Sequence, residues 1–191
     1  MIEFLKGYED YFGDWVWEML IASLVTMELM LLSFILACAL GLVIALMRIS
    51  QFSVLSGLTK VYIGFFRGVP VLVILYWIYF AMPELGYKIL LISSFTAAVL
   101  GLGIHGSAFL AEVFRSGIEA LDHGQMEAAL SLGMTPSQAL RFIILPQAAR
   151  VVLPPMANYS VGLLKETALC SIIAVPELML RAKDVASSSF L

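Results

Sequence analysis

Long apolar runs with almost no formal charge dominate the chain. One run extends from Leu20 to Met47 with Glu28 as its single charged residue, and Arg48 follows it. Two more runs cover about 61–82, with Arg67 near the start, and about 89–117, whose first part is free of formal charge. A membrane-crossing helix needs about 20 predominantly apolar residues. The pattern therefore predicts membrane-spanning helices over about 20–47, 61–82 and 89–117.

The C-terminal third has a shorter apolar run and more charge. Residues 151–164 are uncharged after Arg150 and predict a fourth span, but Pro154 and Pro155 lie near its start. We expect this span to be either broken or sheltered by neighbouring helices. The last stretch, 171–191, contains Pro176, which would open a helix, and closely spaced charges. It is predicted as a re-entrant or interfacial helix, which completes an all-α polytopic bundle in a single domain, 1–191.

Lysine and arginine residues are distributed unevenly over the predicted loops. Five lie after the first and third spans, against two on the opposite side: Arg48, Lys60, Arg115, Arg141 and Arg150 against Lys6 and Lys88. Cytoplasmic loops of membrane proteins carry the excess of these residues. The bias predicts an outside N-terminus and places the segment 122–145 on the cytoplasmic side.

The segment 122–145 has the capping signals of two short helices. Asp122 is a candidate N-cap with Gln125 in the reciprocal position, and Gly133 suits the left-handed C′ position. The sequence Thr135-Pro136-Ser137-Gln138 predicts a second capping box with proline at N1, and Pro146 would end that helix. Periodicity alone leaves two alternatives open: the segment packs beneath its own bundle, or it presents a docking surface.

Composition supports a lipid environment and excludes several function classes. The chain is 61% hydrophobic and 13% charged, with a net charge of −3 and a mean hydropathy of +0.97. The charge leaves no basic footprint for nucleic acid, and no phosphate-loop motif is present, so we expect no ATP binding by this chain. Cys38 and Cys170 have no metal-ligand spacing and are expected to pack in apolar surroundings. His105 and His123 form no nucleophile–base arrangement, and enzyme chemistry is not expected.

Five short motifs occur in one order along the chain. The residues Gly124, Gln125, Glu127, Ala128, Ala129 and Gly133, followed by Ile144-Leu145-Pro146, resemble the EAA motif of ABC importer permeases. Four other stretches resemble further motifs of one branch, with Val69 in place of the usual threonine: Phe66–Pro70, Ala111–Ile118, Leu145–Ala148 and Leu164–Leu169. Together they are similar to the polar amino-acid permeases, the histidine/glutamine/arginine/opine group, over about 20–190.

The resemblance implies a type I ABC importer permease with the MetI-like fold, in a bacterial cytoplasmic (inner) membrane. Two such subunits, identical or related, would form the pathway for a polar or charged amino acid. Two ABC ATPase subunits would bind the ATP, so no cofactor is expected here, and a periplasmic or lipid-anchored substrate-binding protein would deliver the amino acid. Glu127–Gly133 would form the coupling helix that docks on the ATPase. The family's final helix is expected to be missing, because the chain stops at Leu191.

Polar side chains in the predicted spans are the remaining candidates. Glu112 and Arg115 are spaced to pair on one helix face, and a structural ion pair is favoured over substrate contact. Arg67 either fixes helix packing or snorkels to the interface. His105, flanked by glycines, either donates to a backbone carbonyl or lines the pathway.

Two candidates for the translocation pathway come from the fourth predicted span, where an interrupted helix would free backbone groups for substrate. Asn158 has an amide that can bind an ammonium or a carboxylate, and Tyr159 is its neighbour. Lys165, beside Glu166 near the outer surface, belongs to a gate or a contact with the delivery protein, or to a solvated pair. A self-contained channel or secondary transporter for small polar solutes, and a scaffold subunit without transport, are the alternatives to the permease.

Overall fold

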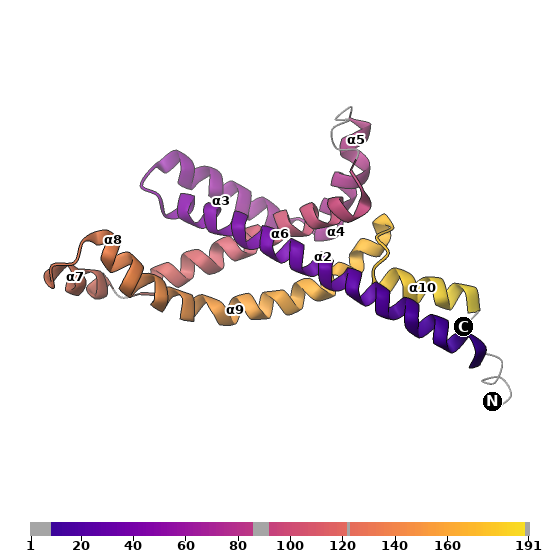
Figure 1. Ribbon diagram of the computed structural model, residues 1–191. Coiled ribbons are helices and arrows are strands. Elements are labelled where there is room, and N and C mark those ends of the chain that lie inside the picture. The colour runs from indigo at the N-terminus through magenta and orange to yellow at the C-terminus, as the bar shows by residue number, and fades with distance from the viewer. Residues whose placement is uncertain (1–8, 86–91, 122, 190–191) are drawn as a thin grey trace. The chain divides into compact units, whose positions relative to one another are not determined.

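The computed structural model describes residues 9–85, 92–121 and 123–189, and every regular element in these ranges is helical (Figure 1). In chain order the elements are α2 (Glu9–Ile49), α3 (Ser53–Gly68), α4 (Val71–Tyr76), a π-helical segment (Trp77–Ala81), α5 (Met82–Glu84), α6 (Ser94–Glu119), α7 (His123–Ser131), α8 (Pro136–Ala139), a second π-helical segment (Leu140–Ile144), α9 (Leu145–Glu166), a 3-10 helix (Thr167–Ile173) and α10 (Leu178–Ser189). Within the described ranges, three helical runs are long and apolar enough to cross a membrane: Phe12–Ile49, Ser94–Glu119 and Pro136–Ile173.

The chain forms two compact units, and α2, α6 and α9 contribute to both. The first unit comprises Met1–Ser33, Val71–Leu102 and Leu163–Leu191, and the second comprises Phe34–Pro70 and Gly103–Gly162. Each has its own buried apolar residues, such as Leu29, Leu75 and Leu163 in the first and Leu110 in the second. The described part of the segment 122–145, called the candidate coupling segment below, and most of the candidate polar residues therefore belong to the second unit.

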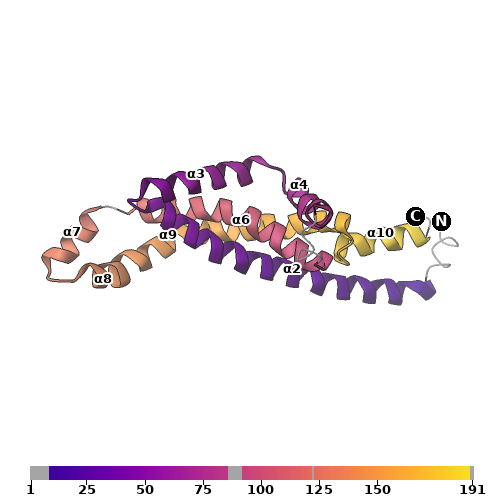
Figure 2. The ribbon, with the colours of Figure 1, turned by 90° about the horizontal axis from the view of Figure 1, so that it is seen from above.

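In the second unit, α3 and α6 lie side by side (Figure 2). The Tyr62 hydroxyl on α3 lies 2.7 Å from Ser107 Oγ on α6 and donates to the Ile104 carbonyl at 3.2 Å. Gly106 on α6 lets α9 approach closely, since a Cβ there would lie 2.9 Å from Tyr159 Cζ and 3.0 Å from Ala37 Cβ. Small residues at helix contacts allow this packing in membranes.

In the first unit, α10 is held against the N-terminal part of α2 (Figure 1). The Leu178 amide donates to Thr26 Oγ1 on α2 at 3.0 Å. The carboxylate of Glu177, only 1% exposed, accepts hydrogen bonds from the Met179 and Leu180 amides, both at 2.8 Å. Glu177 and Thr26 thus satisfy amides at the start of α10 that a helix leaves without internal partners.

The span expected over 61–82 is not one continuous helix. α3 ends at Gly68 and α4 begins at Val71, so the helix is broken at Val69 and Pro70. Val69 between them is extended, with φ −92° and ψ 129°. A residue before proline is disfavoured in the helical region, and Pro70 has no amide to continue the helix. Hydropathy extends across this break because it counts apolar residues without regard to direction.

Of the two alternatives for the fourth span, a broken helix and a helix sheltered by its neighbours, the broken helix is not observed. α9 runs without interruption from Leu145 to Glu166 with Pro154 and Pro155 inside it. Pro146 does not end the preceding helix either, because Pro136–Ile173 is one helical run. A π-helical segment lies directly before Pro146, and there the Leu145 amide bonds the Leu140 carbonyl five residues back. The helix therefore continues through Pro146 with a wider π-helical turn before it, instead of ending there.

The remaining expected bounds shift by several residues. The helix expected over 20–47 already begins at Glu9 and has 41 residues, which is about 60 Å at 1.5 Å per residue. Residues 89–91 of the third expected span lie outside the described residues, and α6 covers Ser94–Glu119. The last helix begins at Leu178, after Pro176, where Glu177 supplies the cap. Whether each helix crosses the bilayer stays a prediction.

Candidate coupling surface and pathway residues

The helix α7 ends in the left-handed turn expected at Gly133. This glycine has φ +81°. Its amide bonds the Leu130 carbonyl at 2.9 Å, and the Met134 amide bonds the Ala129 carbonyl at 3.2 Å. These two bonds form a Schellman motif. Asp122, the expected N-cap of this helix, lies outside the described residues.

The capping box at Thr135 is confirmed. Thr135 Oγ1 accepts from the Gln138 amide at 3.3 Å, and Gln138 Oε1 accepts from the Thr135 amide at 2.9 Å. Pro136 occupies the first helical turn, as expected. The second short helix expected up to residue 145 is wrong, however, since α8 continues through the π-helical segment into α9. The candidate coupling segment is thus one short helix joined by a tight turn to the start of a long one.

One face of α7 is anchored and another is exposed. α7 packs against α8 and the π-helical segment, and its residue Ala129 is only 4% exposed. Gln147 Nε2 on α9 donates to Gln125 Oε1 at 3.3 Å. The remaining motif residues Gly124, Glu127, Ala128 and Gly133 are exposed, as is Leu132 at 84%. Because α7 and α8 lie at one end of the second unit (Figure 1), this surface is open to a partner.

Replacing Thr135 with alanine should weaken this segment. Loss of a serine or threonine N-cap costs about 0.5–2 kcal/mol of helix stability. We expect faster amide exchange over 135–140, measured by hydrogen–deuterium exchange. Ser137→Ala in the same turn is the control, because Ser137 makes no side-chain hydrogen bond among the described residues. Equal exchange in both variants would contradict a capping role for Thr135.

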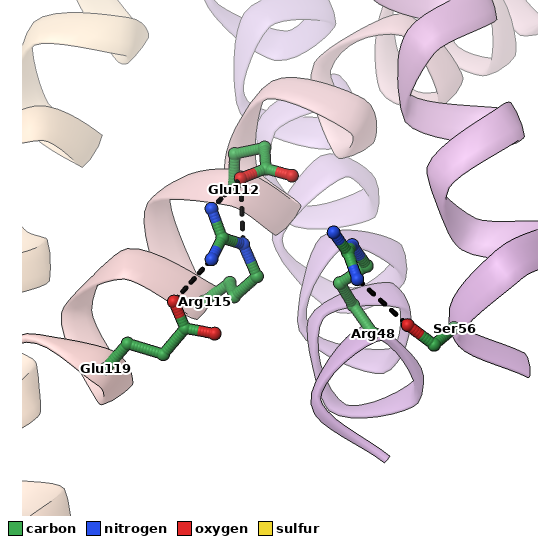
Figure 3. A network of polar contacts seen from close by, with 5 residues as sticks. All are labelled: Arg48, Ser56, Glu112, Arg115 and Glu119. Atoms are coloured by element: carbon green, nitrogen blue, oxygen red, sulfur yellow. Dashed lines mark hydrogen bonds and ion pairs between the residues drawn. The ribbon is translucent and has the colours of Figure 1, made fainter. Parts of the chain in front are cut away.

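The ion pair expected between Glu112 and Arg115 is present on α6 (Figure 3). Arg115 Nη2 and Nε donate to the same oxygen, Glu112 Oε2, at 2.6 and 2.9 Å. Arg115 Nη1 also pairs with Glu119, one turn further on. The sequence analysis missed Glu119, although its four-residue spacing from Arg115 is itself a pairing signal. Arg48 Nη1 at the end of α2 donates to Ser56 Oγ at 2.8 Å, which joins α2 to α3.

A cavity of about 500 Å³ opens beside this network within the second unit. Its charged and polar lining comes from Arg67 on α3 and from Glu112 and Ser116 on α6. Its apolar walls are Phe109, Val113, Val151 and Pro155, with Gly117 and Ala120. Arg67 is exposed and makes no hydrogen bond or ion pair with any described residue. The structure thus brings together Arg67 and Glu112, which the sequence analysis had treated separately.

The four expected pathway residues do not form one site. His105 is half-buried, and its buried Nδ1 has no hydrogen-bond partner in the described part of the chain, so the considered bond to a carbonyl is not formed there. Tyr159 is buried, with ring centroids 5.0 Å from Phe109 and 6.4 Å from Phe34. Asn158 is exposed. Their roles in a pathway stay predictions.

Lys165 lies in the first unit and lines a different cavity. This cavity has about 530 Å³ and includes Thr26, Thr167 and Glu177. Lys165 is exposed and makes no ion pair with Glu166, whose buried Oε2 lacks a partner among the described residues. No ion pair joins Lys165 to Glu166 in the described residues, and the role of Lys165 stays a prediction.

The sequence matches the family described as binding-protein-dependent transport system inner membrane component over residues 37–186. A probable amino-acid ABC transporter permease, PatM of Vibrio harveyi, is 42% identical over 86% of this chain and 74% of its own length. A probable glutamine ABC transporter permease, GlnP of Bacillus subtilis, is 36% identical over 98% of this chain and 84% of its own length. An arginine transport system permease, ArgU of Corynebacterium glutamicum, is 41% identical over 88% of this chain and 57% of its own length.

Solved structures agree with these relatives. A crystal structure of an amino acid ABC transporter with histidines has a TM-score of 0.85 and 36% identity, covering 94% of this chain and 82% of that one. An inward-facing MetNI methionine ABC transporter has a TM-score of 0.61 at 22% identity, and the match covers 86% of this chain and 75% of that one. The second likeness concerns the fold alone.

Proposed function

The chain belongs to the family of binding-protein-dependent transport system inner membrane components, and from this membership we propose that it is the permease subunit of an ATP-driven importer of a polar or charged amino acid. Relatives named for glutamine, arginine and cystine transport support this substrate class. The chain would form part of the translocation pathway of a bacterial inner membrane, with its N-terminus outside.

The geometry of the candidate coupling segment carries this proposal. Glu127 and Ala128 are exposed on α7, while the helix itself packs against α8 and the π-helical segment. The turn at Gly133 and the box at Thr135 keep the connection to α8 short and defined. From Pro136 one helical run reaches Ile173. A displacement of α7 is therefore passed to a single long helix.

Membership of the importer permease family supports three partners. ABC ATPase subunits would contact α7 from the cytoplasm and bind the ATP. A second permease subunit, identical or related, would complete the pathway, and a substrate-binding protein would deliver the amino acid on the outer side.

The test is reconstitution in proteoliposomes with the ATPase and the substrate-binding protein. We expect amino acid uptake that requires internal ATP and both partners, and ATP hydrolysis that rises when loaded binding protein is added. Omitting one component at a time is the control. Uptake driven by an ion gradient without the ATPase would contradict the proposal and favour a self-contained channel or secondary transporter.

A further inference from the structure

Two opposite charges line the same cavity of the second unit without touching. Arg67 and Glu112 both border the cavity of about 500 Å³, yet no hydrogen bond or ion pair joins them. The guanidinium of Arg67 and the carboxylate of Glu112 therefore do not neutralise each other across the cavity. A ligand that carries both charges would fit between such groups.

Arg67 lies where an unpaired charge is costly. It stands in the last turn of α3, about 21 Å along the helix from Ser53 at 1.5 Å per residue. Ionisable residues within membrane segments commonly face a cavity and mark a substrate path or a partner. Arg67 has no partner among the described residues, and its guanidinium offers the planar fork that matches a carboxylate with two hydrogen bonds.

Glu112 keeps one oxygen available. Both Arg115 donors bind Oε2, so Oε1 accepts no hydrogen bond from the described residues. Figure 3 shows one carboxylate oxygen facing Arg115 and the other turned away. The pair with Arg115 orients the carboxylate through Oε2, which leaves Oε1 as an acceptor for an ammonium group.

We propose that this cavity is a binding site for the zwitterionic head of an α-amino acid, with Arg67 binding the carboxylate and Glu112 Oε1 the ammonium group. The inference rests on the proposed function and deepens it. The head is common to all α-amino acids, so these two residues would recognise the class. The apolar walls formed by Phe109, Val151 and Pro155 leave the side chain without a charged partner. Arg67 thus has a ligand-binding role instead of the packing or snorkelling role expected from the sequence.

Direct binding to the assembled permease–ATPase complex, without the substrate-binding protein, tests the site. The probes are L-arginine and L-glutamine, their α-carboxamides, and their Nα-acetyl derivatives, measured by saturation-transfer difference NMR in lipid nanodiscs. We expect the amide and the acetyl derivative each to bind at least about tenfold more weakly than the free amino acid, since each loses one charge-assisted contact.

Arg67→Gln should weaken binding of the amino acid by at least about tenfold and abolish the preference for acid over amide. Arg67→Lys keeps the charge but loses the fork, and should fall between wild type and glutamine. Arg150→Gln is the matched control, because Arg150 is exposed on α9 and does not line the cavity. An unchanged acid-to-amide ratio in Arg67→Gln would overturn the proposal.

A second measurement leaves Arg67 in place. Ser116→Cys, in a chain with Cys38 and Cys170 replaced by alanine, puts a thiol in the cavity wall. The free amino acid should slow labelling of this thiol by a charged methanethiosulfonate, and the amide should not. Equal protection by the two probes, or none by either, would refute the site.

Three outcomes distinguish the zwitterion site from a simple anion site and from the proposed function. A preference for the acid that survives Nα-acetylation would mean that Arg67 binds another anion, such as a lipid phosphate, and would overturn the zwitterion site. Absence of binding by either amino acid to the wild-type complex would also overturn it. If ATP-driven uptake persists while these tests fail, the proposed function stands and only the site is lost.

Discussion

Replacing Glu127 with lysine is expected to reduce ATP-dependent amino acid uptake to less than about a tenth of the wild-type rate. A like-charge or unpaired contact in a protein interface costs several kcal/mol, and each 1.4 kcal/mol corresponds to about a factor of ten in affinity. Glu127 is exposed in the middle of α7, on the surface proposed to dock on the ATPase.

The measurements are uptake, ATP hydrolysis stimulated by loaded binding protein, and recovery of the ATPase with the purified permease. All three should fall together, because loss of docking removes the partner as well as the coupling. Glu127→Gln should have a smaller effect, since it removes the charge without reversing it. Glu84→Lys is the charge-matched control, because Glu84 is exposed at the end of α5 and lies outside the candidate coupling segment. Normal stimulation and uptake in Glu127→Lys would contradict the proposed docking surface.

Glu177→Ala should destabilise the first unit strongly. The substitution leaves the Met179 and Leu180 amides without their acceptors at a position that is 1% exposed. Hydrogen bonds to charged groups contribute about 1.5–3 kcal/mol each, so the two lost bonds should cost about 3–6 kcal/mol in total. We expect the apparent Tm of the purified complex, measured by intrinsic fluorescence, to fall by about 6–24 °C.

The same variant should release α10 from α2. The remaining tie at the start of α10 is the Leu178 amide bond to Thr26 Oγ1, so amide exchange should rise over 178–189. Asp184→Ala on the same helix is the control, because Asp184 makes only an exposed pair with Arg181 at 3.4 Å, and such pairs contribute about 0–1 kcal/mol. A thermal shift no larger than that of Asp184→Ala would show that Glu177 is dispensable as a cap.

Features set by neighbouring residues were predictable. The box at Thr135 and the turn at Gly133 depend on side chains three residues apart and on one backbone angle, so short-range rules located them. The pair of Glu112 with Arg115 follows from helical spacing in the same way. The resemblance to the importer permeases also came from short local motifs, and the matched relatives agree with it.

Prolines were the source of the main errors. Pro70 interrupts a run that hydropathy treats as continuous, while Pro146, Pro154 and Pro155 lie inside continuous helix. The difference at Pro146 depends on the wider π-helical segment before it, which no propensity at a single position indicates. Glu177 was missed because its capping function depends on the start of α10, which the sequence analysis placed at Pro176.

By itself the sequence determined that this chain is a helical protein of the importer permease family with several long apolar runs, and it located the candidate coupling segment. These conclusions rest on apolar run lengths, charge bias and spacings of a few residues. Only the tertiary structure decided that α7 has an exposed face, that Glu177 and Thr26 hold α10, and that Arg67 and Glu112 share one cavity without pairing. The physical reason is distance along the chain: these groups meet through packing of helices far apart in sequence, and local preferences carry no information about which side chains that packing brings together.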